Sequence, residues 1–144
     1  MKVEIKLSAD IHEPYAVIYA DSINDEIQKA VIALESGENV ITAKSGERIV
    51  LLRANEIHMI RAEAEKIFIY TKTDKYLSNR RLYEFETMLG TGFIRISKSV
   101  LVNLKQISSV EASFNSMMLL IMKNSEKDYI SRKYLPAFKK RLGL

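Results

Sequence analysis

Hydrophobic and polar residues alternate over short stretches through most of this chain, and the pattern predicts a mostly β protein. From residue 40 onward, short apolar runs are separated by turn residues, as is typical of antiparallel strands. Ser45-Gly46 and Asn115-Ser116 each lie between two such runs and predict β-hairpins. The predicted strands cover residues 40–44, 48–53, 56–61, 66–72, 75–77, 107–113, 117–122 and 128–131. Two further apolar runs, 93–96 and 100–104, flank a short polar stretch.

Two segments of this region have helical rather than strand spacing. The run RRLYEFETML, residues 80–89, places apolar residues at helical intervals and stops at Gly90. Residues 133–142 form a last amphipathic segment. Pro136 is tolerated there because it falls in the first helical turn, where a missing N–H costs little. The expected fold class is therefore mostly β with short helices (α+β).

The first forty residues predict a strand, a second strand and a helix. Val3, Ile5 and Leu7 alternate with charged residues, which is the period of a half-buried strand. Residues 15–20 (YAVIYA) are more continuously apolar and could form a central strand. Asp21 and Ser22 are expected to cap a helix with the apolar stripe Ile23, Ile27, Ala30, Val31 and Leu34, which ends before Gly37. We therefore expect an N-terminal β/α extension over 1–40 and a β-rich domain over 41–144.

Composition limits the chemistry that this chain can carry. The 144 residues are 47% hydrophobic, which suits one ordinary domain with its own core. The chain has no cysteine, and His12 and His58 lie 46 positions apart, so we expect no metal site, cofactor or nucleophilic active site. No secretory or membrane-spanning run is present, and we expect a cytoplasmic protein.

Charge is unevenly distributed along the chain. Residues 1–62 hold seven Lys or Arg and ten Asp or Glu, a net charge of −3, whereas residues 63–144 hold fifteen and eight, a net charge of +7. A basic half of this kind suits a polyanionic partner. A solvated lysine-rich surface would give the same count, so charge alone leaves both interpretations open.

The most informative stretch is FIRISKSVLVNLKQI, residues 93–107, because small polar and basic residues interrupt its apolar runs. It resembles the signature of LytTR-type DNA-binding domains, in which F-x-R-x-(H/S)-x-S leads into (L/I)-V-N and a following isoleucine. Residues 75–89 resemble the strand and helix that precede this signature, and residues 129–142 resemble the C-terminal S-R-x-Y element. The resemblance extends from about Ile41 to the C-terminus.

The resemblance implies a fold and a way of binding DNA. The fold is a LytTR-like elongated stack of small antiparallel sheets, and loops rather than a recognition helix contact duplex DNA. Lys98 takes the place of a DNA-contacting side chain, flanked by Ser97, where histidine is commoner, and by Ser99. Arg132 takes the place of the arginine that reaches the major groove, where its planar fork suits guanine. Lys133 is expected to contact phosphate.

Several candidate residues keep alternative interpretations. Lys98 could be a solvated turn lysine. Arg132 could instead pair with Glu126 or Asp128. Lys66 lies near a third DNA-contacting loop of the family, although the neighbouring glutamates would repel phosphate, and an ordinary strand-start lysine is the other interpretation. Arg95 could reach a backbone phosphate or an internal carboxylate. Asn103 is expected to cap or hydrogen-bond a turn, because a buried amide needs partners.

We therefore expect a sequence-specific, double-stranded DNA-binding transcriptional regulator that is not an enzyme and has no small-molecule substrate. Paired promoter repeats, as commonly recognised in the family, imply a homodimer, for which the first forty residues are the natural candidate. Many members of the family carry a receiver domain, for which those residues leave no room. Resemblance to the standalone members, which are often paired with a small membrane protein that restrains them, implies such a protein as an inhibitor here. The alternative is a protein-protein interaction module whose DNA affinity is incidental.

Overall fold

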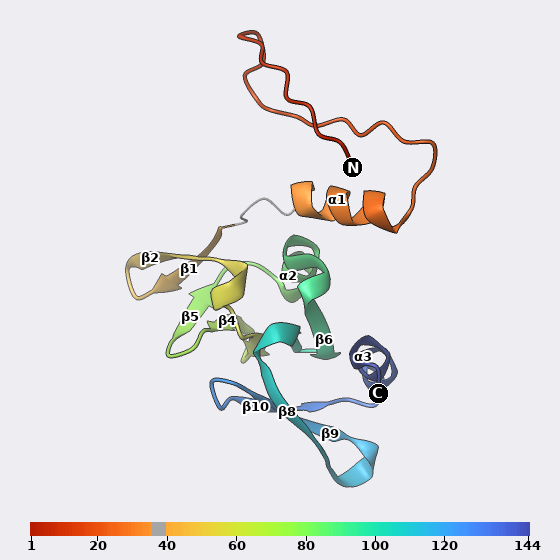
Figure 1. Ribbon diagram of the computed structural model, residues 1–144. Coiled ribbons are helices and arrows are strands. Elements are labelled where there is room, and N and C mark those ends of the chain that lie inside the picture. Colours follow the sequence, from red (N-terminus) through yellow and green to blue (C-terminus); the bar gives the residue numbers. More distant parts are fainter. Residues whose placement is uncertain (36–39) are drawn as a thin grey trace. The chain divides into compact units, whose positions relative to one another are not determined.

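The computed structural model describes residues 1–35 and 40–144 (Figure 1). The chain divides into two units, Met1–Gly37 and Glu38–Leu144, and residues 36–39 are not described. We refer to them as the N-terminal unit and the β-rich unit.

The N-terminal unit contains one helix, α1 (Asp25–Glu35), in its described residues. The predicted helix is confirmed, but its cap is Asn24 rather than the Asp21-Ser22 pair. The Asn24 side-chain oxygen accepts a hydrogen bond from the Ile27 N–H at 3.0 Å, which satisfies one of the free donors of the first turn. The Ser22 hydroxyl donates to Asp21 instead. The predicted end before Gly37 lies outside the described residues.

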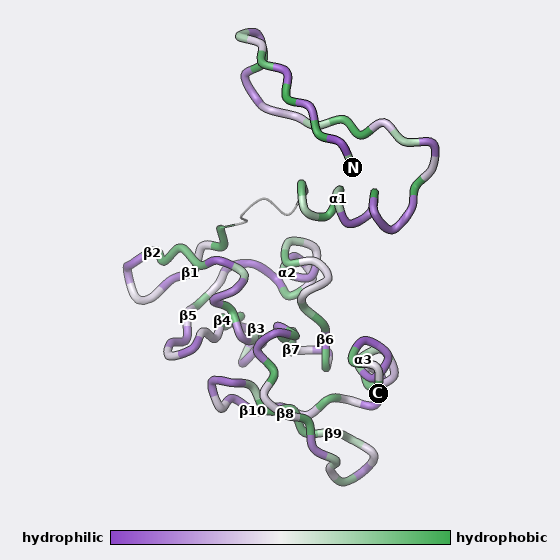
Figure 2. Tube along the Cα trace, viewed as in Figure 1, coloured by the Kyte–Doolittle hydropathy of each residue, from purple (hydrophilic) through white to green (hydrophobic). Residues whose placement is uncertain are grey.

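The strands predicted over residues 3–7 and 15–20 are wrong for this structure, in which neither segment is a strand. Val3, Ile5 and Leu7 are 77%, 82% and 94% exposed. Figure 2, which colours the chain by hydropathy, shows hydrophobic and hydrophilic positions interspersed along the N-terminal segment. An alternating pattern makes a segment competent to form a strand, but the strand also needs a partner for its backbone groups. Neither sheet formed by the described residues includes these segments.

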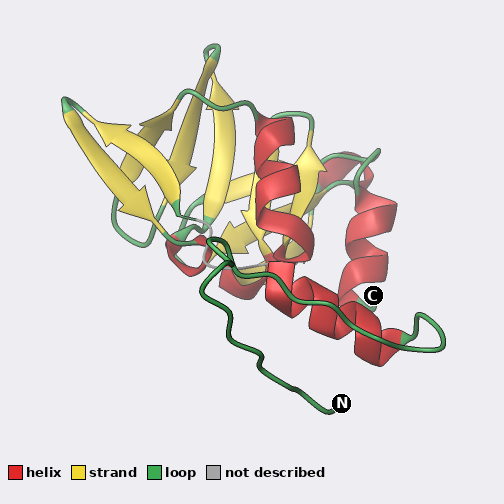
Figure 3. Ribbon diagram, turned by 90° about the horizontal axis from the view of Figure 1, so that it is seen from above, coloured by secondary structure: helices red, strands yellow, loops and turns green. Residues whose placement is uncertain are grey.

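Short strands and helices make up the β-rich unit, as predicted. Figure 3, which colours strands yellow and helices red, makes the excess of strand visible. All strand pairs are antiparallel. The strands are β1 (Ile41–Ser45), β2 (Arg48–Leu52), β3 (Met59–Glu63), β4 (Lys66–Tyr70), β5 (Lys75–Ser78), β6 (Phe93–Ser97), β7 (Val100–Asn103), β8 (Ile107–Ala112), β9 (Met118–Met122) and β10 (Lys127–Ile130). The helices are α2 (Leu82–Leu89) and α3 (Leu135–Leu142).

The strands form two sheets. The larger is seven-stranded, in the order β2-β1-β5-β4-β3-β7-β6, and the smaller is three-stranded, in the order β10-β9-β8. Both predicted hairpin turns are present, at Gly46 and at Asn115-Ser116. Gly46 has φ +62°, which a glycine adopts without a steric penalty, whereas Asn115 and Ser116 reach φ +57° and +59° with side chains attached.

Two apolar clusters hold the β-rich unit together. Helix α2 places Phe85 in the first cluster, against strands of the larger sheet such as β1 and β7. The second cluster joins the two sheets: it contains Ile96 from β6 and Ile130 from β10, together with Phe138 from α3. Phe85 and Phe138 are both fully buried. Burial of each large apolar side chain of this kind stabilises the fold by about 1.5–3 kcal/mol.

Asn103 fixes the end of β7 in the way predicted from the sequence. The residue is buried, and its Nδ2 donates hydrogen bonds to the carbonyls of Ile57 at 2.9 Å and Ala54 at 3.4 Å. Its Oδ1 accepts a hydrogen bond from the Lys105 N–H at 3.0 Å. One side chain thus satisfies two segments that are far apart in sequence, which explains why an amide is suited to this apolar stretch.

Candidate nucleic-acid interface

The topology of the larger sheet brings two turns to the same end. Strands β4, β3, β7 and β6 are consecutive neighbours. Because they are antiparallel, the β3–β4 turn and the β6–β7 turn lie at the same end of the sheet, where these strands end or begin. The N–H of Ala62, near the end of β3, donates to the carbonyl of Ser99 at 2.8 Å. Lys66 and Lys98 are thereby placed on adjacent turns.

A third loop joins them from the smaller sheet. The Ser131 N–H, just after β10, donates to the carbonyl of Ile96 in β6 at 2.9 Å. This bond places residues 131–134 beside the end of β6, where the polar stretch begins. We call the turns 63–66 and 97–99 and the loop 131–134 the three-loop edge.

The three-loop edge carries exposed cations. Lys66, Lys98, Arg132 and Lys133 are all exposed. Within the described ranges 1–35 and 40–144, neither Lys98 nor Arg132 has a carboxylate within ion-pair distance. Lys133 Nζ lies 5.6 Å from the ring centroid of Tyr134, a neighbour in sequence. These side chains can therefore reach a ligand without first breaking an internal ion pair.

The two serines shape the turn that presents Lys98. The Ser99 N–H donates to the Ser97 hydroxyl oxygen at 3.3 Å, and the two hydroxyl oxygens lie 3.5 Å apart. The register of β6 against β7 shifts between Arg95 and Ser97, and such an irregularity re-aims the side chains beyond it. Lys98 lies at the tip of this turn.

Arg95 has the internal carboxylate that was one of its two predicted partners. Its guanidinium forms an ion pair with Glu86 of α2, and its Nη1 donates to the Lys98 carbonyl at 2.9 Å. Only 20% of its side chain is exposed. Arg95 therefore ties the 97–99 turn to α2 and fixes the backbone that carries Lys98.

Arg61 is a residue of this region that the sequence interpretation missed. Its Nε pairs with Asp128 Oδ2 at 3.1 Å, its Nη2 donates to the Lys127 carbonyl at 2.8 Å, and its Nη1 lies 3.6 Å from Glu126 Oε2. Glu126 and Asp128, the carboxylates considered as partners of Arg132, are thus engaged by Arg61. The signal in the sequence was an arginine inside the apolar run MIRA, together with two acidic residues spaced for one face of a strand.

Arg61, on β3, is bonded to Asp128 and to the Lys127 carbonyl of β10 and so clamps the two strands together. The direction of its pKa shift is consistent with these contacts. Burial lowers the pKa of Arg61, but the carboxylate of Asp128 and the hydrogen bond with Glu63 outweigh burial and raise it. Only 17% of its side chain is exposed. Because β10 leads directly into residues 131–134, this clamp sets the position from which Arg132 projects.

Glu63 stays ionised, but Arg61 and Lys75 balance its negative charge, so it repels phosphate less than its place in the sequence suggests. Burial raises the pKa of Glu63, but hydrogen bonds from Lys75, Tyr70 and Arg61 outweigh it and lower the pKa to about 2. The Lys75 contact is 2.8 Å long. The remaining acidic residue of the turn, Glu65, is exposed.

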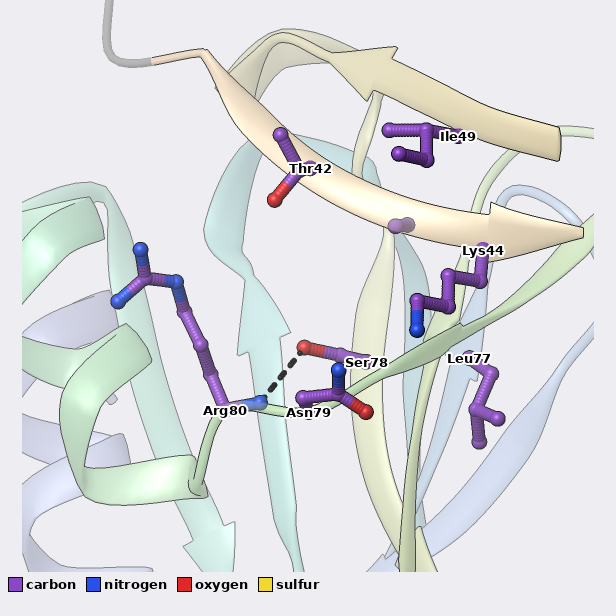
Figure 4. Close-up of a pocket in the computed structure, with 8 residues that line it drawn as sticks. Thr42, Lys44, Ile49, Leu77, Ser78, Asn79 and Arg80 are labelled. Carbon is purple, nitrogen blue, oxygen red and sulfur yellow. Dashed lines mark hydrogen bonds between the residues drawn. The ribbon is translucent and has the colours of Figure 1, made fainter.

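Two hollows of the β-rich unit have different linings. One, of about 530 Å³, is lined by Glu56, His58 and Asp74 among other residues. The other, of about 320 Å³, lies beside β1 and β5, and Figure 4 shows Arg80 next to it with its backbone N–H donating to the Ser78 hydroxyl oxygen. No carboxylate or histidine is among the residues that line it. The described residues also contain no group of three His, Cys, Asp or Glu that could hold a metal ion. Among the helices that the structure describes, none combines the length and apolar character needed to cross a membrane.

Comparisons with known proteins show the family of this chain. The model of the LytTr DNA-binding domain family matches residues 47–143. Two HTH-type transcriptional regulators, from Staphylococcus aureus strains NCTC 8325 and COL, are each 27% identical over 146 residues, which cover 100% of this chain and 99% of the relative. A solved LytTr DNA-binding domain, from a protein described as a methyl-accepting/DNA response regulator of Bacillus cereus, superposes with a TM-score of 0.71 and 28% identity and covers 75% of this chain and 100% of its own. The resemblance found in the sequence is confirmed, and the chain belongs to the family of LytTr DNA-binding domains.

Proposed function

We propose that this protein is a transcriptional regulator that binds duplex DNA sequence-specifically through its three-loop edge. The observation that carries the proposal is the convergence of three loops, each with an exposed cation, at one end of the larger sheet. The family match supports DNA as the ligand and favours it over the alternative of a protein-protein interaction module.

Loops rather than a helix-turn-helix would read the DNA. The relatives are named HTH-type, but α2 and α3 are separated by five strands, so they do not form two helices joined by a tight turn. Arg132 lies two residues after the end of β10 and can present its guanidinium to a guanine edge in the major groove, a contact worth about 1–3 kcal/mol of discrimination. Lys66, Lys98 and Lys133 are suited to phosphate contacts, which supply affinity that falls steeply with salt.

The serines and Arg95 would act differently at this interface. Ser97 and Ser99 are hydrogen-bonded to each other within the 97–99 turn. Their hydroxyl groups can still donate to a phosphate oxygen. Arg95 is already engaged with Glu86 and the Lys98 carbonyl, so we assign it to positioning Lys98 rather than to contact.

The proposal includes partners beyond DNA. Two copies would bind paired promoter repeats as a homodimer in the cytoplasm. A small membrane protein would restrain the regulator, in which case promoter output should differ between cells with and without it. Catalysis and a small-molecule substrate form no part of the proposal.

Substitutions at the three-loop edge test the proposal. Arg132→Ala should reduce the preference for a specific upstream site over random duplex by about 10-fold to 100-fold. Lys98→Ala should weaken binding to all sequences and lower the slope of log affinity against log salt by about 0.9. Affinity would be measured by fluorescence anisotropy at two or more salt concentrations.

Matched controls come from the opposite end of the same sheet. Arg48 begins β2, and Lys105 follows β7 at the end remote from the 97–99 turn; both are exposed. Arg48→Ala and Lys105→Ala should leave preference and salt slope unchanged. If Arg48→Ala and Arg132→Ala reduce the preference equally, the three-loop edge is not the reading surface.

A further inference from the structure

The first nine residues have the pattern of a strand, but no strand of the described chain pairs with them. Their ion pairs join the Met1 amino group to Glu26 and Lys2 to Glu4. Val3, Ile5 and Leu7 point apolar side chains into solvent from a stretch in which every second residue is polar. We propose that this segment pairs with the same segment of a second copy, antiparallel and with Ile5 opposite Ile5. The inference deepens the proposed homodimer and rests on it.

Apolar complementarity supports this register. Two antiparallel strands related by a two-fold axis at Ile5 place Val3 opposite Leu7 twice and Ile5 opposite its own mate. All three exposed apolar side chains of each copy then share one face. A single segment leaves these side chains exposed, whereas pairing removes part of their surface from water.

Charge complementarity selects the same register among its neighbours. With Ile5 on the axis, Glu4 lies opposite Lys6 in both halves of the ladder. With Glu4 on the axis, Glu4 would face Glu4 and Lys2 would face Lys6, and parallel in-register pairing would also set like charges side by side. A two-fold axis at Val3 pairs Lys2 with Glu4 but leaves Leu7 without an apolar partner.

A second copy is also the occupant that the proposed function requires. A two-fold axis through the strand pair makes an isologous interface, in which each copy uses the same surface. Each copy then brings one three-loop edge, which matches the two members of a paired repeat. A sheet edge that is left open would instead be a site for indiscriminate pairing.

The absence of cysteine allows a direct test of the register on the full-length protein. Residues directly opposite in antiparallel strands have Cα atoms about 4.5–5.5 Å apart, within the range that a disulfide spans. Ile5→Cys should give a covalent dimer under mild oxidation. Val3→Cys should not, because its mate is displaced by four residues, whereas the double variant Val3→Cys, Leu7→Cys should cross-link.

Charge exchange provides a second test that needs no oxidation. Glu4→Lys should weaken dimerisation about tenfold in analytical ultracentrifugation, because two attractive pairs become repulsive. The double variant Glu4→Lys, Lys6→Glu should recover wild-type affinity, since it exchanges the charges within each pair. This recovery would exclude a folding defect as the cause of the loss.

The opposite results would overturn the inference. A monomeric wild-type protein, or equal cross-linking through positions 3 and 5, would show that the segment does not pair in this register with a second copy. The outcome is distinguishable from failure of the proposed function, because the effect of Arg132→Ala on DNA preference is measured separately. Loss of that effect with intact cross-linking at position 5 would reject DNA reading by Arg132 and retain the dimer.

Discussion

Replacing Arg61 with methionine should destabilise the β-rich unit while keeping most of the apolar stem that packs in the same place. Arg61 pairs with Asp128 and Glu63 and approaches Glu126, and its side chain is only 17% exposed. In the variant Asp128 and Glu126 would lose their cationic partner, and Glu63 would keep only Lys75. We therefore expect the free energy of unfolding to fall.

The size of the effect follows from the exposure of the groups. Breaking a fully buried ion pair by removing one partner costs about 3–5 kcal/mol, whereas an exposed pair contributes about 0–1 kcal/mol. The carboxylate side chains here are between 28% and 40% exposed, so the site lies between these limits. We expect a loss of about 2–3 kcal/mol for Arg61→Met.

Urea unfolding followed by circular dichroism would measure this loss, with a fall of roughly 1–2 M in the midpoint. Arg48→Met is the matched control, because Arg48 is exposed in the β1–β2 hairpin, and its effect should stay within about 0.5 kcal/mol. A double-mutant cycle with Asp128→Asn should give a coupling energy of about 1–2 kcal/mol.

Two results would refute the reasoning about the clamp. One is an Arg61→Met variant as stable as Arg48→Met. The other is a coupling energy near zero, which would mean that Arg61 and Asp128 are adjacent without stabilising each other. If the clamp exists, folded Arg61→Met should also show a lower preference for specific DNA, because the loop that carries Arg132 follows β10.

Two further predictions concern stability. Because the pKa of Glu63 is lowered to about 2 from an ordinary 4.5, its stabilising contribution is present above pH 4.5 and is lost as pH falls toward 2. The free energy of unfolding of wild type should therefore exceed that of Glu63→Gln by about 1–2 kcal/mol at pH 6, after allowance for solvent screening, and by less at pH 3. A difference that stays constant with pH would contradict the ion pairs assigned to Glu63. Phe138→Ala should cost about 3–5 kcal/mol in urea unfolding, because Phe138 is fully buried between the sheets, whereas Phe114→Ala, at an exposed position, should cost under about 1 kcal/mol.

The hairpins and short helices could be predicted from the sequence because their signals are local. A turn such as Ser45-Gly46 and the apolar spacing of residues 82–89 need no knowledge of distant residues. Asn103 could also be interpreted correctly, since a buried amide amid apolar neighbours must be hydrogen-bonded. The partners it found, Ala54 and Ile57, could not be named, because nothing local specifies them.

Non-local features explain what the sequence did not predict. Residues 3–7 have a correct strand pattern, but pairing depends on a partner that the single chain does not provide within its described residues. Arg61 was missed because its partners on β10, which make it a link between the sheets, lie more than sixty positions away. The order of the strands, which decides that Lys66, Lys98 and Arg132 lie at one edge, is likewise set by packing between sheets rather than by local pattern.

The cations in and beside the three-loop edge are of two kinds, and mutagenesis should affect the two kinds differently. Arg61 and Arg95 are largely buried and engaged with carboxylates, so they contribute to stability and to the positions of the loops. Lys98 and Arg132 are exposed and contribute little to packing, so their replacement should change DNA binding at nearly constant stability. A plot of affinity for the specific site against stability across the alanine variants of Arg61, Arg95, Lys98 and Arg132 should therefore separate into two pairs. If all four variants fall on one line, loss of DNA binding reports only loss of folding, and the proposed roles of Lys98 and Arg132 as direct contacts are wrong.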